Sequence, residues 1–324
     1  MVNALRRSLS PSGDGPSRAQ LILLGSIAIA VVIIGLTVLI NTVLFTESVG
    51  SSSLDNRIDE TSEFDTEVIT GTRSLVFRIG HDSRNLTEAE LRAAVDRNVT
   101  RYGRAISESY ATSRPVAVSL SYSNASTIAN RTVQGVDENI TSDDGTADWR
   151  LAENKTVGWF TLNVDVIDTT TEQLHINATN ASAGEWVNIS INRSGGGNVS
   201  VSSTVSDAAG DTATCTSVDG RVLLDIYAGD VLTQSATGCT FNGTSTIHSP
   251  YSIDVVNGGN LVGKYSVVTK EEIPDSRTDA CTDAVADQPC VAPVLWTANI
   301  STAFEGESVT YSNTYNISIY GENT

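Results

Sequence analysis

Basic residues are scarce in this chain, and lysine is the scarcest. Only three of its 324 residues are lysine. The chain has 20 Lys and Arg residues and 38 Asp and Glu residues, which gives a formal net charge of −18. A surface this acidic repels phosphate backbones, so we expect no nucleic-acid partner. Many carboxylates with few lysines also suit a protein in concentrated salt, which screens self-repulsion. An ordinary acidic ectodomain is the alternative interpretation.

The sequence also lacks the motifs of common enzyme classes. No G-x-S-x-G, H-E-x-x-H, Walker or dinucleotide-binding pattern occurs. Its three histidines, His81, His175 and His248, are far apart and lack metal-ligand spacing. The run HDS from His81 has the residue types of a triad, but sequence neighbours point in different directions, so we expect a loop. The run TSDDGTAD (141–148) lacks EF-hand spacing, so we expect a solvated turn, with a weak calcium site as the alternative. We predict no enzyme, no cofactor and no metal site.

Cysteine is rare, and its four copies all lie in the C-terminal half: Cys215, Cys239, Cys281 and Cys290. No C-x-x-C spacing occurs, which argues against zinc and redox motifs. An even number outside the cytoplasm indicates two disulfides. Three pairings exist, and we favour Cys215–Cys239 with Cys281–Cys290 because each pair is close in sequence. Free buried thiols are the alternative.

One long stretch carries no charge. Leu21 to Phe45 spans 25 apolar or uncharged positions between Arg18 and Glu47. As a helix it would cover about 37 Å, more than the roughly 30 Å hydrocarbon core of a bilayer. A cleaved secretory signal has a shorter apolar region and an A-x-A-like site, and no such site follows here. We therefore predict that residues 20–46 stay in the membrane as a transmembrane helix.

Flanking charges predict the orientation of that helix. Arginines precede it at positions 6, 7 and 18, whereas carboxylates follow it at 55, 59, 60, 63 and 65. The positive-inside rule then leaves residues 1–19 in the cytoplasm as a leader and places the chain after the helix outside the cell. No second apolar run occurs, so we expect a single-pass protein of the cytoplasmic membrane with an extracellular C-terminal domain.

The junction SRAQL, residues 17–21, resembles the class III signal of archaeal type IV pilins and archaellins. In that family a membrane peptidase cuts after Gly or Ala and leaves the helix intact, which implies cleavage between Ala19 and Gln20. Many pilins have a Glu five residues into the mature helix, where this chain has Leu24, so the resemblance implies processing more directly than assembly. Arg18 as a simple positive-inside anchor is the alternative.

Taken whole, the chain is similar to uncharacterised pilin-like single-pass surface glycoproteins of haloarchaea. These pair a short basic leader and an RAQL helix with an acidic, sequon-rich β ectodomain. The resemblance implies membrane lipid as a partner, together with other copies of the chain or other pilin-like and envelope proteins. It implies no biochemical activity.

Outside the membrane we predict three segments. We assign residues 47–84 to a juxtamembrane tether with a candidate first strand, because the stretch SVGSSSLDNRIDETSE (48–63) is polar and Ser-rich. Residues 85–112 read as an amphipathic helix, because Thr87 and Glu90 form a capping-box pattern and an apolar stripe runs from Leu91 to Tyr110. Residues 113–324 read as an extracellular β domain, of one or two subdomains.

The β domain is predicted from a change to period two. Phe160, Leu162, Val164 and Val166 share one face of a strand. Three hairpins are expected at 185–203, 251–268 and 294–320, each around a Gly-containing turn. The fold class is therefore mainly β, with one N-terminal transmembrane helix, one amphipathic helix and an antiparallel β-sandwich-like ectodomain.

Glycosylation sequons are abundant on the proposed outer side. Several head residues, such as Asn188 and Asn192, alternate with apolar neighbours and so fall on the solvent face of a strand. We therefore predict a heavily glycosylated surface; the alternative is that Asn, Ser and Thr simply populate exposed β faces. The candidate sites are Asn85, Asn98, Asn124, Asn130, Asn139, Asn154, Asn177, Asn180, Asn188, Asn192, Asn198, Asn242, Asn299 and Asn316.

These features favour a membrane-anchored, glycosylated cell-envelope protein with a structural or interaction role, as a pilin-like subunit or minor pilin. A surface glycoprotein that is anchored but never polymerises is the alternative within this class. An extracellular binding module or hydrolase is the alternative from another class.

Overall fold

The structure is a computed structural model that describes residues 62–113, 116–123, 125–233, 239–271, 279–281, 289–306 and 310–321. The leader at 1–19, the predicted span at 20–46 and the cleavage residues Ala19 and Gln20 lie outside these residues. Among the helices that are described, none combines the length and the apolar character that crossing a bilayer requires. Residues 65–324 form one compact unit, and the description below concerns that unit.

Two helices begin the described chain. The first covers residues 62–82, and α2 (Glu88–Ser113) follows after a short loop. The predicted capping box is present: the Thr87 amide donates to Glu90 Oε2 at 2.9 Å, and the Glu90 amide donates to Thr87 Oγ1 at 3.3 Å. Leu91, Val95 and Val99 are buried along one stripe. The amphipathic-helix prediction is therefore confirmed.

Helix 62–82 corrects the sequence interpretation, which placed these residues in a tether with a candidate first strand. Its buried positions include Val68, Thr72, Val76 and Gly80, each four residues apart, which puts them on one helix face. Gly71 leaves room for the Tyr102 side chain of α2, because a Cβ at this position would lie 1.9 Å from the Tyr102 hydroxyl oxygen. That hydroxyl donates to the Glu67 carbonyl at 3.2 Å.

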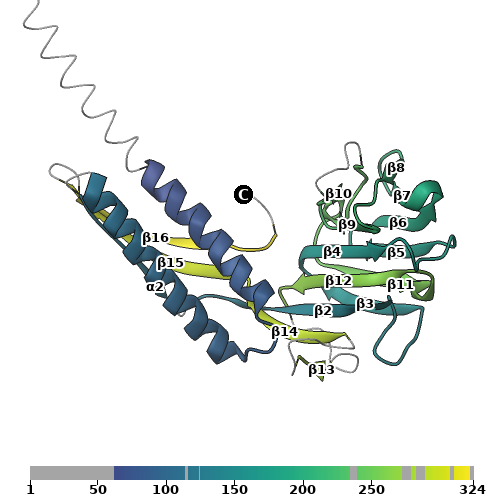
Figure 1. The fold of residues 1–324 in the computed structure, drawn as a ribbon, viewed down its shortest axis with the longest axis horizontal. Coiled ribbons are helices and arrows are strands. Elements are labelled where there is room, and N and C mark those ends of the chain that lie inside the picture. The colour runs from purple at the N-terminus through teal and green to yellow at the C-terminus, as the bar shows by residue number, and fades with distance from the viewer. Residues whose placement is uncertain are drawn as a thin grey trace, which may run out of the picture. The chain divides into compact units, whose positions relative to one another are not determined.

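A three-stranded sheet accompanies the helices (Figure 1). Its order is β1 (Ala117–Ser123), β15 (Thr297–Glu305) and β16 (Thr310–Ser318), all antiparallel. Helix α2 packs on β1, and the Tyr311 hydroxyl of β16 donates to Asp65 Oδ1 of the first helix at 2.8 Å. The predicted hairpin at 294–320 is confirmed by the β15–β16 pairing.

Two larger sheets form the sandwich. The seven-stranded sheet has the order β10-β9-β4-β12-β2-β14-β13, and the six-stranded sheet has the order β3-β11-β5-β6-β7-β8. All pairings are antiparallel except β13–β14. One continuous core contains Leu162, Leu224 and Val267 from the first sheet and Ile176, Ile189 and Ile253 from the second. The mainly β, antiparallel sandwich-like prediction is therefore confirmed.

The strands of the sandwich have the following bounds: β2 (Ile128–Asn139), β3 (Trp149–Lys155), β4 (Val157–Asp165), β5 (Leu174–Asn180), β6 (Glu185–Ser194), β7 (Asn198–Val205), β8 (Asp211–Cys215), β9 (Arg221–Asp225), β10 (Asp230–Val231), β11 (Tyr251–Val256), β12 (Val262–Thr269), β13 (Asp279–Ala280) and β14 (Cys290–Leu295). The β6–β7 pairing around Gly195–Gly197 confirms the predicted hairpin at 185–203.

The predicted hairpin at 251–268 is wrong, because its two strands lie in different sheets. β11 pairs with β3 and β5, whereas β12 pairs with β2 and β4. The intervening turn crosses from one sheet to the other and is held against neighbouring loops. The Gly258 amide donates to the Ala147 carbonyl at 2.9 Å. A Cβ at Gly258 would lie 1.9 Å from the Ile140 carbonyl oxygen, so only glycine fits.

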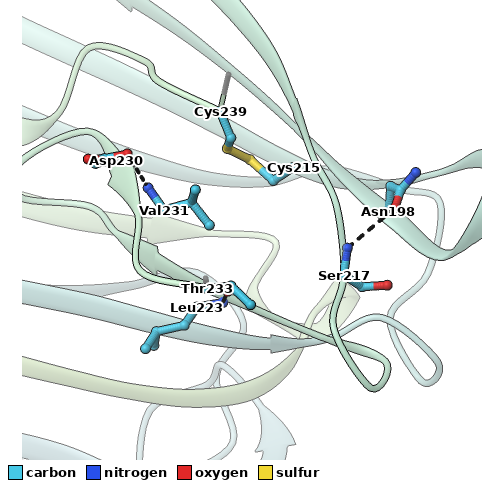
Figure 2. The surroundings of a disulfide bond; sticks show 8 residues. All are labelled: Asn198, Cys215, Ser217, Leu223, Asp230, Val231, Thr233 and Cys239. Atoms are coloured by element: carbon cyan, nitrogen blue, oxygen red, sulfur yellow. Dashed lines mark hydrogen bonds between the residues drawn. A yellow bond between two sulfur atoms is a disulfide. The ribbon is translucent and has the colours of Figure 1, made fainter. Parts of the chain in front are cut away.

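Two disulfides join Cys215 to Cys239 and Cys281 to Cys290, the pairing favoured from sequence. The first connects the end of β8, at the edge of the six-stranded sheet, to the segment that follows β10 of the other sheet (Figure 2). The second lies beside β13 and β14, where both sulfur-bearing residues pack with Val133 and Ala292. The disulfide prediction is confirmed, and the alternative of free thiols does not apply.

Candidate functional site: the helix end and the aromatic cleft beside it

Among the described residues, buried polar side chains lie where helix 62–82 ends beside the seven-stranded sheet. Arg131 of β2 is only 5% exposed. Its Nη1 donates to the carbonyls of His81 at 3.0 Å and Gly80 at 3.3 Å, while Nε donates to Ser266 Oγ at 2.8 Å. Carbonyls at a helix C-terminus lack intrahelical donors and carry partial negative charge, so a guanidinium is a suitable cap.

Arg131 remains positively charged at neutral pH although it is buried. Burial lowers the pKa of its guanidinium to about 10, which still leaves it protonated at neutral pH. The capping bonds are therefore charge-assisted and stronger than neutral ones. Arg131 ties the last turn of the helix to the centre of the sheet.

His81 occupies the same junction in an aromatic setting. Its ring stacks on Phe77 with centroids 4.0 Å apart and meets Trp159 edge-on at 5.8 Å. Nδ1 lies 3.0 Å from the Phe77 carbonyl and therefore carries the proton, and the Tyr320 hydroxyl lies 3.3 Å from the same nitrogen. Nε2 is buried without a hydrogen-bond partner. Burial first, and then the positive charge of Arg131, lower the pKa of His81 to about 4.

This depressed pKa predicts a pH-dependent stability. Because His81 is neutral in the fold but protonates near its ordinary pKa of 6.5 when unfolded, the unfolded state binds more protons between these values, and stability falls as pH falls. We expect the free energy of unfolding to drop by about 2 kcal/mol between pH 7 and pH 5 from this group.

Urea unfolding of the wild type and the His81→Gln variant at both pH values measures the effect. The variant should lack this drop in the free energy of unfolding. The neighbouring groups Asp82, Arg131 and Tyr320 are present in both proteins, so the difference between the two reports on His81. Equal pH dependence of the two proteins would contradict the assignment.

A cleft of about 610 Å³ opens beside the helix end. One wall comes from helix 62–82 and the other from β4 and from the segments at 225–228 and 319–321. The lining residues are Ile69, Thr70, Arg73, Ser74, Phe77, Gly158, Trp159, Asp225, Tyr227, Ala228, Ile319, Tyr320 and Gly321. We call this space the aromatic cleft.

Two polar groups of the aromatic cleft are unusual. Trp159 Nε1 is a buried donor without a partner. The Asp225 carboxylate is 7% exposed and accepts a hydrogen bond from the Ala228 amide at 2.9 Å, and burial raises its pKa. Aromatic walls with a few convergent polar groups are typical of sites for small ligands that have both apolar faces and polar edges.

The three histidines lie in different parts of the described fold. His175 Nδ1 lies 2.7 Å from Ser190 Oγ on the outer side of the six-stranded sheet, and His248 Nδ1 lies 2.7 Å from Glu185 Oε1. The three histidines thus occupy separate hydrogen-bonded environments. Asp82 bonds Arg78 at 3.2 Å rather than His81 or Ser83. Within the described ranges, no cluster of His, Cys, Asp or Glu has metal-binding geometry.

The loop at 141–148 is a closed turn. The Thr146 amide donates to Ser142 Oγ at 3.0 Å and to Asp144 Oδ1 at 3.1 Å, and Ser142 Oγ also bonds Asp144. Asp148 Oδ1 accepts a bond from the Asn257 amide at 2.7 Å. These carboxylates therefore accept hydrogen bonds from amides of the loop itself and of the turn that crosses between the sheets.

The sequons are distributed over the whole folded unit. Asn85, Asn139, Asn154 and Asn316 are exposed; Asn98, Asn130, Asn177, Asn188, Asn192, Asn198, Asn242 and Asn299 are half-buried; and Asn180 is buried. Asn124 lies outside the described residues. The expected alternation is present on β6, where Val187, Ile189 and Ile191 are buried and Asn188 and Asn192 are not.

Sequence reasoning missed helix 62–82 and the groups at its end. The spacing of four among Val68, Thr72 and Val76 was a usable helix signal. Nothing local marks Arg131 as buried, since it lies in a strand between polar neighbours. A scan against protein-family models finds no match, and a search among curated proteins finds no relative, so inference of function depends on the residues themselves.

Proposed function

We propose that the protein is a membrane-anchored, glycosylated cell-envelope protein with a structural or interaction role, in the form of a pilin-like subunit or minor pilin. The observation that carries the proposal is the uncharged apolar run from Leu21 to Phe45, flanked by arginines before it and carboxylates after it. Membrane lipid is then one partner, and other copies of the chain or other envelope proteins are the rest.

The described fold supports this role through the first helix. Helix 62–82 is the part of the folded unit nearest in sequence to the apolar run. Arg131 holds its end, and Tyr102 and Tyr311 bond its earlier turns. An anchor that precedes such a helix would be joined to a firmly docked element of the folded unit.

The disulfides support an extracytoplasmic location. Two disulfides with no free cysteine among the described residues are typical of proteins that fold in an oxidising compartment. The fourteen sequons all follow the apolar run, as the proposed topology requires.

Two measurements on cells that produce the protein test the proposal. Mass spectrometry of the membrane-extracted chain should find Gln20 as the N-terminal residue, and protease added to intact cells should digest the β domain. The variant Ala19→Leu should keep the leader, whereas the matched change Ala4→Leu should not alter cleavage. A terminus at Met1 or Val2 in the wild type contradicts the pilin route but leaves a non-polymerising anchored glycoprotein. A β domain that is protected until lysis contradicts the topology itself.

A hydrolase receives less support from the geometry. Among the described residues, His248 pairs with Glu185 but bonds no serine or cysteine, and His175 bonds Ser190 but no carboxylate, so neither histidine has both a nucleophile and an orienting partner. The aromatic cleft has polar groups suited to binding a ligand, but its lining residues include no histidine to activate a nucleophile. A binding module is therefore the alternative that the cleft favours, and it is compatible with a surface location.

A further inference from the structure

The sequons differ sharply in what their side-chain nitrogens do in the fold. An N-linked glycan is attached through Nδ2 of asparagine, so the acceptor side chain must reach solvent and its nitrogen must be available. We propose that Asn85, Asn139, Asn154 and Asn316 carry glycans and that Asn98, Asn180, Asn188, Asn242 and Asn299 do not. This inference rests on the extracellular location proposed above, and it specifies which residues of that surface are modified.

The modification requires a sugar donor from outside the chain. The donor is an activated sugar whose anomeric carbon is bonded to a lipid-linked phosphate or pyrophosphate. A transferase forms the bond from Nδ2 to the anomeric carbon while the carbon–oxygen bond to the phosphate breaks. The lipid phosphate leaves, and one Nδ2 proton passes to a base of the transferase. No electrons are gained or lost, and the folded chain supplies only the amide.

The four proposed acceptors are exposed in the fold. Asn85 lies in the loop between the two helices, and Asn139 is the last residue of β2. Asn154 has a positive φ of 50° at the end of β3, beside a shift in strand register. Asn316 lies on β16, an edge strand of its sheet. None of the four donates a hydrogen bond from Nδ2 to another described residue.

Asn180 is the clearest of the five excluded sites. It is 6% exposed, and its Nδ2 donates to the His248 carbonyl at 2.8 Å. Its Oδ1 accepts bonds from the amides of Ser182 and Ala183 at 3.0 and 3.1 Å. The side chain thus closes its own turn, and a glycan on Nδ2 would have to break it open.

The other four excluded sites use Nδ2 within the fold as well. Asn98, inside α2, donates to the Ala94 carbonyl at 2.8 Å, and Asn299 donates to the Ala125 carbonyl at 3.2 Å. Asn242 donates to Asp211 Oδ2 at 2.9 Å. Asn188 donates to Oδ1 of Asn177, which is its direct partner on β5.

Cross-strand geometry adds a second reason at one position. Asn299 and Asn316 are direct partners on β15 and β16. Side chains of such pairs lie close together on one face of a sheet, so bulky glycans on both would collide. Asn316 is the exposed member with the available nitrogen, and it should be the one modified.

Site-resolved mass spectrometry of the full-length protein, purified from membranes of the organism that encodes it, tests the proposal. Peptides that contain Asn85, Asn139, Asn154 and Asn316 should carry glycan mass, and those that contain the five excluded residues should have bare asparagine. Two single hydroxyl deletions provide a matched comparison. Thr141→Ala destroys the sequon of Asn139 and should remove one glycan from the intact mass. Ser182→Ala destroys the sequon of Asn180, keeps its amide hydrogen bonds, and should leave the glycan mass unchanged.

The possible outcomes separate this inference from the proposed function. Glycan on Asn180 or Asn98 overturns the sorting by Nδ2, because the fold would then not control modification. Bare asparagine at all four exposed sites, in a protein whose β domain is digested on intact cells, overturns glycosylation but leaves the anchored topology standing. Bare asparagine with a protected β domain shows instead that the proposed location has failed.

Discussion

Replacing Arg131 by Met should lower the free energy of unfolding by about 3 kcal/mol, because buried carbonyls would lose charged donors. The residue is 5% exposed and caps the Gly80 and His81 carbonyls at the end of the first helix. Met fills a similar volume, so the loss reports mainly on hydrogen bonds rather than on a cavity. Lys should restore only part of the stability, because an ammonium lacks the planar fork that reaches Ser266 and both carbonyls together.

Urea unfolding of the full-length chain in detergent measures this effect, and Arg78→Met is the matched control. Arg78 bonds Asp82 at 3.2 Å at the surface, with side chains 80% and 66% exposed, so its loss should change little. Arg131→Met should also raise the pKa of His81, because the positive charge of Arg131 lowers that pKa. A cost below about 1 kcal/mol for Arg131→Met would show that the cap is not a principal attachment of the helix.

Removal of the Cys215–Cys239 disulfide should have an effect of similar size. The bond closes a sequence separation of 24 residues, for which loss of the restraint on the unfolded chain predicts about 3 kcal/mol. Both sulfur-bearing residues are buried in the core, so a double change to Ala is preferable to Ser, which would bury two hydroxyls. Denaturant midpoints of the double variant and the oxidised wild type, compared at the same detergent concentration, give the difference.

The second disulfide provides an internal comparison. Cys281–Cys290 closes a separation of only 9 residues, so its removal should cost about 1 kcal/mol less than removal of the first. The reverse order of the two double variants would contradict an account based on loop length. Unfolding free energies identical to the wild type in both variants would mean that neither bond restrains the chain.

Features with local causes were predictable from sequence. Helix α2 needed only the capping box at Thr87 and a stripe of apolar residues, and both act within a few turns. The β6–β7 hairpin needed only alternation and the three glycines from Gly195. The disulfide pairing followed from closeness in sequence.

Features decided by distant partners were not predictable. The strands around Asn257 alternate as a hairpin does, yet each finds better partners in a different sheet, and the turn between them crosses the sandwich. The aromatic cleft combines Phe77, Trp159, Asp225 and Tyr320 from four separate segments. Arg131 offered no signal, because its role depends on a helix end that lies some fifty residues earlier.

The pairing of β1 with β15 joins strands that are far apart in sequence, so we expect it to form late in folding. Ala117 meets Glu305 and Ser123 meets Asn299, so the strand beside α2 has no sheet partner until the last strands have been made. Closing so long a loop is slow compared with local pairing. The sandwich, whose strands lie between these two, can form first. The three-stranded sheet is then completed only when the C-terminal hairpin arrives, and until that moment β1, beside α2, lacks its strand partner β15.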